Sequence, residues 1–154
     1  MAMPRRHLGG FLKTTTYVRG LLAGIGLAAL AQAQSATKAI VDSNCRILVP
    51  SDWTETTLGG RGARSPEDRA FNAIVRGFKG DEYQSVVASM KGAKGTVVDE
   101  NGNLILLLVP FYNGQQQYVA ITKTSPLACR TSVRFSKGKE STARQIAESV
   151  KPLK

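Results

Sequence analysis

Two Asn-Gly dipeptides, Asn101-Gly102 and Asn113-Gly114, flank the apolar run of residues 104–109 and constrain the fold more than any other feature. Asn-Gly between strand-like residues is a strong hairpin signal, because both residues tolerate the left-handed backbone of a type I′ turn. Strands joined by such tight turns are antiparallel, since parallel neighbours need a long crossover. The run is apolar at every position, which predicts a strand in the middle of the sheet with both faces covered.

Three other segments alternate apolar and polar residues with the period of two that is typical of a strand. They are residues 45–49, residues 69–78 and residues 127–135. The first of them is followed by the turn residues 50–52. Between the first two of these strands, residues 57–68 contain three glycines and are predicted to form a flexible connection or an irregular hairpin.

Two segments switch to helical periodicity. Residues 81–92 carry apolar side chains at i, i+3, i+4 and i+7. Asp81 is predicted as the N-cap and Gly92 as the left-handed C-terminal position. Residues 141–154 predict a second helix with an apolar stripe at positions 143, 146, 147 and 150. Hairpin-linked strands followed by helices predict an α+β fold, an antiparallel sheet with helices packed on it.

The first 33 residues have the layout of a secretory signal peptide: four basic residues and no acid, followed by an apolar run, residues 21–31. This run is too short for a bilayer span, which takes about 20 residues, so no integral membrane anchor is predicted. Ala31-Gln32-Ala33 places cleavage after residue 33. A flexible lead-in, residues 34–43, would then precede one domain, residues 44–154. Arg5-Arg6 leaves twin-arginine export open beside general secretion.

Export determines how the two cysteines are interpreted. In an oxidising compartment Cys45 and Cys129 are predicted to form one structural disulfide. A redox-active pair would favour the close spacing Cys-x-x-Cys, which is not present. The protein is therefore predicted to be periplasmic or secreted.

The order of the elements, together with two short motifs, resembles the PsbP-like superfamily. The first strand ends in VPSDW, with Pro50 and Trp53, and the last helix ends in AESVKP, with Ser149-Val150-Lys151. This group is named for an extrinsic subunit of photosystem II and includes bacterial exported proteins of unknown role. The resemblance covers residues 44–152. It implies a three-layer α/β/α sandwich with a central antiparallel sheet, and a role in binding or assembly. The mature chain lacks the histidine expected of the metal-associated members, and no functional residue is carried over.

The chemistry available to the chain is restricted by its single histidine. His7 lies in the segment predicted to be removed, which excludes Ser-His-Asp and Cys-His mechanisms and histidine-ligated zinc from the mature protein. Acids come mainly as sequence neighbours, which point to opposite faces of a strand, so no facing pair is evident. We therefore predict no catalytic residue, no metal and no cofactor. A small periplasmic enzyme with a carboxylate and arginine site, or a lipid or small-ligand carrier, is the alternative.

Two features bear on binding. Trp53 could be an exposed anchor for a partner, but large aromatic side chains are mostly buried, and the core is the preferred prediction. The glycines of residues 59–64, GGRGAR, lack the strand-to-helix context of a phosphate loop. A flexible loop is therefore the default for this segment, and anion binding is the alternative.

Charge is the remaining functional signal. Loss of the predicted signal peptide lowers the net charge from +10 to about +6, from 17 Lys and Arg against 11 Asp and Glu. We predict an exported, non-catalytic binding or accessory protein of the bacterial envelope. Its partner would be an unknown protein or an anionic envelope component, and not nucleic acid. The candidate contacts on one strand face are Arg130 and Arg134. Further candidates lie earlier in the sequence: Arg61, Arg64, Arg69 and Arg76. The alternative is a solvated basic surface.

Overall fold

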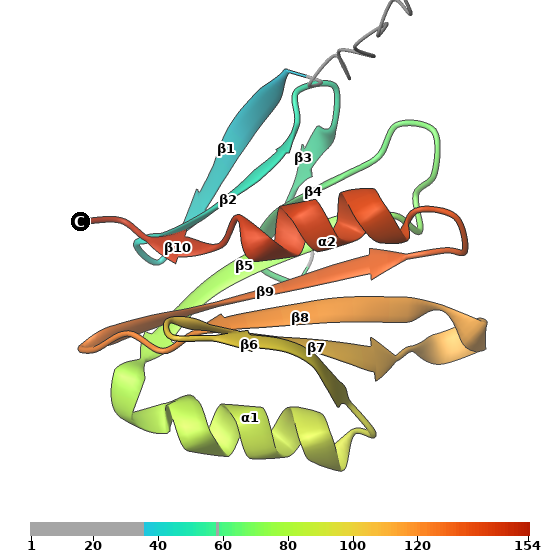
Figure 1. Ribbon diagram of the computed structural model, residues 1–154. Coiled ribbons are helices and arrows are strands. Elements are labelled where there is room, and N and C mark those ends of the chain that lie inside the picture. The colour runs from blue at the N-terminus through green and yellow to red at the C-terminus, as the bar shows by residue number, and fades with distance from the viewer. Residues whose placement is uncertain (1–35, 58) are drawn as a thin grey trace, which may run out of the picture. The chain divides into compact units, whose positions relative to one another are not determined.

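A computed structural model describes residues 36–57 and 59–154, so the predicted signal peptide lies outside the described residues. Two antiparallel sheets and two α-helices make up the described part of the chain (Figure 1). The larger sheet has the strand order β3-β4-β5-β9-β8-β7-β6, and the smaller has the order β1-β2-β10. The strands of the larger sheet are β3 (Thr54–Thr56), β4 (Arg61–Arg64), β5 (Asn72–Lys79), β6 (Thr96–Asn101), β7 (Leu104–Pro110), β8 (Gln116–Thr122) and β9 (Leu127–Phe135). Those of the smaller sheet are β1 (Thr37–Asp42), β2 (Cys45–Pro50) and β10 (Lys151–Pro152).

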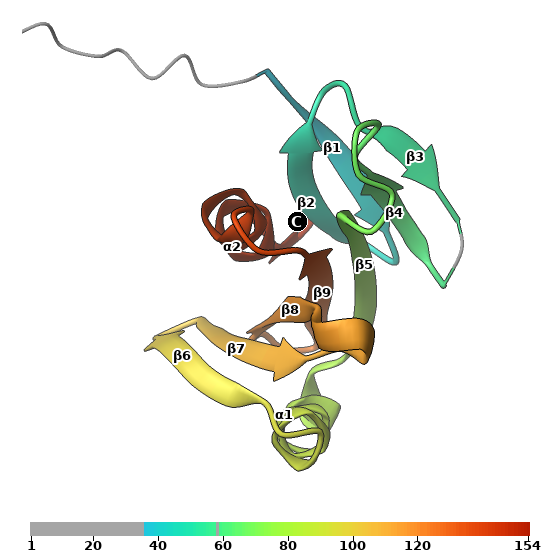
Figure 2. The same cartoon turned by 90° about the vertical axis from the view of Figure 1, so that its right-hand side faces the viewer.

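The larger sheet is the central layer. On one face α1 (Tyr83–Gly92) inserts Val87 among apolar side chains of β7 and β8. On the other face lie α2 (Glu140–Glu148) and the smaller sheet, which share the main core with β5 and β9. Figure 2 shows α1 and α2 on opposite sides of β7, β8 and β9. The α+β fold with a central antiparallel sheet between helical layers is therefore confirmed, with the smaller sheet as an addition to the α2 layer.

A disulfide joins the two sheets. Cys45 in β2 and Cys129 in β9 are bonded, with their Cα atoms 5.6 Å apart, as predicted. Gly77 of β5 is paired with Cys129, and a Cβ at this glycine would lie 2.4 Å from the Ser43 carbonyl oxygen and 3.2 Å from Cys45 Sγ. A glycine is therefore required where β2 crosses β5.

Trp53 closes the core beside this bond. Its side chain is 4% exposed and makes an edge-to-face contact with Phe71, with the ring centroids 4.7 Å apart. The core prediction for Trp53 is confirmed. Edge-to-face packing of this kind adds about 0.5–1.5 kcal/mol to the free energy gained by burying the rings.

The two predicted hairpins form with different turns. Asn113 and Gly114 both have positive φ, 57° and 73°, as the predicted type I′ turn requires. In the first hairpin Asn101 pairs with Leu104, so the turn residues are Gly102 and Asn103, and neither has a positive φ. The type I′ prediction is wrong there, because the register moves Asn101 into the strand. Strand β7 is buried on both faces as predicted, although it lies next to the edge strand β6.

Three local predictions are corrected. Residues 37–42 of the predicted flexible lead-in form β1, which pairs along its whole length with β2 and buries Ile40. The helix starts later than predicted, because residues 80–82 form a 3₁₀ turn and Asp81 caps nothing. Gly92 lies inside α1, and Lys94 takes the left-handed position instead, with φ 63°.

Candidate functional site

The candidate site is a basic half of one face of the larger sheet. Residues paired across a ladder point to the same face of a sheet. Arg64 pairs with Asn72, and Asn72 pairs with Arg134. Two residues further along the same strands, Gly62, Ile74 and Ser132 form a second row, and after that Arg76 pairs with Arg130. We call the four arginines of these rows the arginine face: Arg64, Arg76, Arg130 and Arg134.

The arginine face lies beside the part of the sheet that α1 covers. Ser132 pairs with Val119 and Arg130 pairs with Ile121, and both apolar partners pack in the cluster under α1. In Figure 2, α1 lies below β7 at one end of the sheet, whereas β3 and β4 are at the other end. One face of the sheet is thus apolar under the helix and basic beyond it.

Strand spacing gives the size of this surface. Arg130 and Arg134 are four residues apart on β9, which is about 13 Å at the rise of a strand. Arg64 and Arg134 are two strands apart, or about 10 Å. The four positive charges therefore occupy an area that suits a side chain cluster or an extended segment of a partner.

The sequence grouped Arg61 with Arg64, but the structure separates them. Arg61 pairs with Val75, which is fully buried in the core on the α2 side of the sheet. Arg61 therefore lies on the face opposite Arg64. Arg69 is exposed in the loop before β5 and belongs to neither row.

Arg130 and Arg134 of this face are partly buried, and none of its four arginines forms an ion pair within the described residues. Burial, and to a smaller extent the charge of Arg76, lowers the pKa of Arg130. Burial also lowers the pKa of Arg134. The Arg134 guanidinium stacks on the Phe111 ring, with Cζ 3.7 Å from the ring centroid, and its Nε is buried without a hydrogen-bond partner. Both groups remain protonated at neutral pH, because an arginine loses its proton only far above it.

The ion pairs formed within the described residues lie elsewhere. Lys123 pairs with Glu100, and Arg144 binds both Asp99 and Glu148 at 2.6 Å and 2.7 Å. Sequence reasoning saw no facing carboxylates, yet the fold brings Asp99 and Glu148 to the same guanidinium. The depression next to this group has a volume of only about 10 Å³, far below the 300–1,000 Å³ of a typical ligand pocket.

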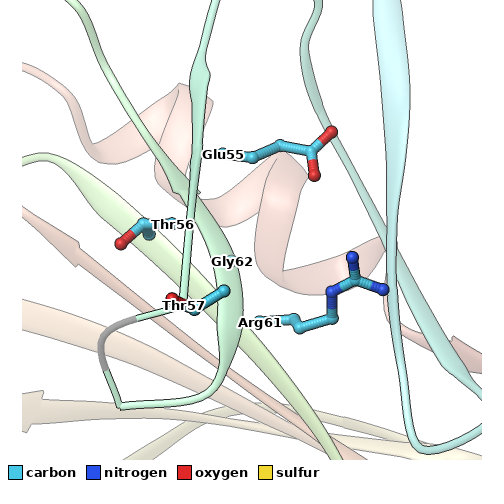
Figure 3. Close-up of a pocket in the computed structure, with 5 residues that line it drawn as sticks. All are labelled: Glu55, Thr56, Thr57, Arg61 and Gly62. Carbon is cyan, nitrogen blue, oxygen red and sulfur yellow. The ribbon is translucent and has the colours of Figure 1, made fainter.

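A larger pocket lies at the β3–β4 hairpin. It has a volume of about 300 Å³ and is lined by Glu55, Thr56, Thr57, Arg61 and Gly62. Figure 3 shows Glu55 and Arg61 extending to the same side of the hairpin. Both side chains are exposed, and they form no ion pair with each other. A single carboxylate beside a single guanidinium in an open pocket can hold a polar group in place.

Between residues 36 and 154, residue 58 left aside, no three His, Cys, Asp or Glu side chains gather closely enough to hold a metal ion. Neither described α-helix has the length and apolar character that crossing a membrane requires.

Sequence reasoning missed the rim of the arginine face. Tyr112, at the tip of the β7–β8 hairpin, is 77% exposed and directly follows Phe111, whose ring stacks on the Arg134 guanidinium. A tyrosine next to an Asn-Gly turn is consistent with an exposed hairpin tip. No local sequence pattern, however, indicates that Arg134 of β9 packs on the neighbouring Phe111.

Comparisons with known proteins support the fold but identify neither a family nor a function. No family model matches the chain, and no curated protein matches it. The structure is similar to a crystal structure from Bacteroides thetaiotaomicron VPI-5482, with 18% identity and a TM-score of 0.53 over 72% of this chain and 46% of that one. It is also similar to the solution structure of cyanobacterial PsbP (CyanoP) from Synechocystis sp. PCC 6803, with 13% identity and a TM-score of 0.49 over 87% and 98% of the two chains.

These similarities are distant. The chain spans about half the length of the Bacteroides protein that it matches. At such identities a structural likeness carries information on the fold alone. The fold of the described residues is therefore shared with part of the Bacteroides structure, and membership of the PsbP-like superfamily remains a prediction.

Proposed function

We propose that the protein is an exported, non-catalytic binding protein of the bacterial envelope, of PsbP-like type, which docks an acidic partner protein on its arginine face. One observation carries the proposal: four arginines share one sheet face, and none of them has an acidic partner within the described residues. Unpaired charges that are partly desolvated gain free energy when an opposite charge arrives from outside.

A protein partner is favoured over a lipid surface or a polymer by the types of residue present. All the charged residues in these rows are arginines, and none is a lysine. Arginine and tyrosine are enriched at protein interfaces, and lysine is depleted there. The exposed Tyr112 at the rim supplies the aromatic anchor that such interfaces commonly use. The Cys45–Cys129 disulfide fits an oxidising compartment such as the periplasm.

Crosslinking in intact source cells tests the proposal. Tagged wild type is compared with an Arg130→Glu, Arg134→Glu variant and with a control, Lys137→Glu, Lys139→Glu, which makes the same change of charge at exposed positions in the β9–α2 loop. Mass spectrometry should identify one acidic protein that wild type and control capture and the arginine variant does not. Urea unfolding of all three proteins checks that they remain folded.

Two results would overturn the proposal. Equal capture by the arginine variant would show that the partner does not use this face. Binding of the purified protein to phosphatidylglycerol vesicles, with no protein captured in cells, would assign the face to a lipid surface instead. Where the partner is captured, its affinity for the purified protein should fall steeply with added salt, because exposed charges are screened over about 10 Å at 0.1 M.

A further inference from the structure

We infer that Arg76 and Arg130 form a binding site for one oxyanion, a carboxylate or phosphate group, and that the Gly59-Gly60 turn holds this site in shape. The inference rests on the proposed function only for the source of that group, which would be carried by the acidic partner. The site itself belongs to the isolated protein and is testable without the partner.

The strand register forces the two arginines together. Arg76 and Arg130 are directly opposed in the β5–β9 ladder. Side chains at opposed positions have Cβ atoms about 4.5–5.5 Å apart, and like charges there destabilise a sheet. The strands cannot slip by one residue to relieve this repulsion, because a slip would turn the buried side chains of Ala73 and Val75 out of the core.

The Gly59-Gly60 turn restrains the Arg76 side chain. Arg76 Nη2 donates a hydrogen bond to the Gly59 carbonyl oxygen. Gly60 has φ 128°, and a Cβ at this position would lie 2.8 Å from Arg76 Nε. Glycine is therefore needed for two reasons: the backbone is one that side chains rarely adopt, and the guanidinium passes directly over it.

The contacts of Gly59 and Gly60 with Arg76 give a role to glycines whose function could not be decided from the sequence. The segment GGRGAR does not cradle an anion with its own backbone amides. Instead, a carbonyl oxygen of the turn orients a guanidinium, and the guanidinium faces the solvent. The flexible-loop prediction is wrong for residues 61–64, which form β4. The anion-binding alternative stays a prediction, and under this inference Arg76 would supply the contact to the anion.

The remaining groups leave a place for an oxyanion. Arg130 is half-buried, which reduces the conformational entropy that it loses on binding. Its neighbours in the ladders are Arg76 and the apolar Ile121. In the part of the chain that the structure describes, neither arginine forms an ion pair. Guanidinium groups carried at opposed positions of a ladder can each donate N–H hydrogen bonds to the oxygens of one carboxylate or phosphate.

Isothermal titration of the purified protein at low ionic strength tests the inference, with inorganic phosphate and acetate as separate probes. Wild type should bind one equivalent of at least one of these anions, with saturation. Arg130→Gln should weaken that binding at least about tenfold, which corresponds to the loss of one charged hydrogen bond. Arg130→Lys should lie between the two, because it keeps the charge and loses the planar fork.

Two further variants locate the effect. Arg69→Gln is the matched control: it removes the same charge at an exposed position in the loop before β5, outside the arginine face, and should bind as wild type does. Gly60→Ala should weaken binding although no charge is removed, because it displaces Arg76. If Arg69→Gln weakens binding as much as Arg130→Gln, the anion responds only to net charge, and the inference is wrong.

The two probes separate the sources of the oxyanion. Much tighter binding of phosphate indicates a phosphoryl group on the partner, and comparable binding of acetate indicates a carboxylate. Both results support the site. If neither anion saturates while wild type still captures its partner in cells, the oxyanion site is overturned and the proposed function stands. If phosphate or acetate binds but no partner is captured, the site stands and the proposed function fails.

Discussion

Reduction of the Cys45–Cys129 disulfide should lower the stability of this domain more than any single contact in it. The bond closes a loop with a sequence separation of 84 residues. The loss of chain entropy in the unfolded state corresponds to about 4.5 kcal/mol for a loop of this length. A small domain has a net stability of about 5–15 kcal/mol, so the reduced protein should be close to marginal.

Urea unfolding of the oxidised and the reduced protein measures this difference. Trp53 is a suitable fluorescent reporter, because it is the only tryptophan of the chain and lies in the same core as Cys45. Reduction should lower the free energy of unfolding by about 4 kcal/mol and the melting temperature by roughly 15–20 °C, from the unfolding entropy of a domain of about 120 residues. A Cys45→Ala, Cys129→Ala variant should be slightly less stable than the reduced protein, because it also loses two buried sulfur atoms.

A loss below about 1 kcal/mol on reduction would refute this reasoning. It would mean that β2 is held on β5 and β9 by packing alone, or that the unfolded chain keeps the two cysteines close without the bond. Comparison of the reduced protein with the double alanine variant separates the contribution of the covalent link from that of the sulfur atoms.

Two smaller predictions concern a turn and an ion pair. Gly114→Ala should lower the free energy of unfolding by about 1 kcal/mol, because φ at Gly114 is 73°. The control Gly102→Ala, at a turn glycine with open space and no positive φ, should be nearly neutral, and equal losses in urea unfolding would contradict this reasoning. The hydrogen bond from Lys123 holds the pKa of Glu100 below its usual value of 4.5, so Lys123→Gln should raise that pKa in an NMR titration. Because the folded pKa is depressed, the stabilisation by this pair is present above pH 4.5 and is lost as the pH falls through the folded pKa, and an unchanged Glu100 pKa in the variant would disprove the assignment.

The elements that could be predicted from sequence are those with strong internal periodicity. Strand β9 alternates from Cys129 to Phe135 and was located correctly. The apolar stripe located α2, but the helix ends at Glu148 and not at residue 154, because residues 151–152 pair with β2 as β10. Strand β1 was missed because only Ile40 of its six residues is buried, and its strand conformation comes from pairing with β2. Strand β4 was not recognised because its glycine-rich segment was interpreted as flexible. These glycines are needed instead for close contact with β5 and Arg76.

The candidate site could be predicted only in part. Arg130 and Arg134 were placed on one face from the alternation of β9 alone. The pairing of Arg76 with Arg130 depends on contact between strands more than 50 residues apart in the sequence, and no local pattern encodes it. Arg61 and Arg64 are three residues apart, so recognition of β4 as a strand would have shown that they face opposite ways.

The disulfide has a consequence for the synthesis of the protein. In a chain exported as proposed, Cys45 would enter the oxidising compartment before Cys129, which lies 84 residues later in the sequence. Many exported proteins with several thiols form incorrect bridges in such an interval. This chain has only two cysteines, so no incorrect bridge within the chain is available, and an early thiol can wait for its partner without the help of a disulfide isomerase.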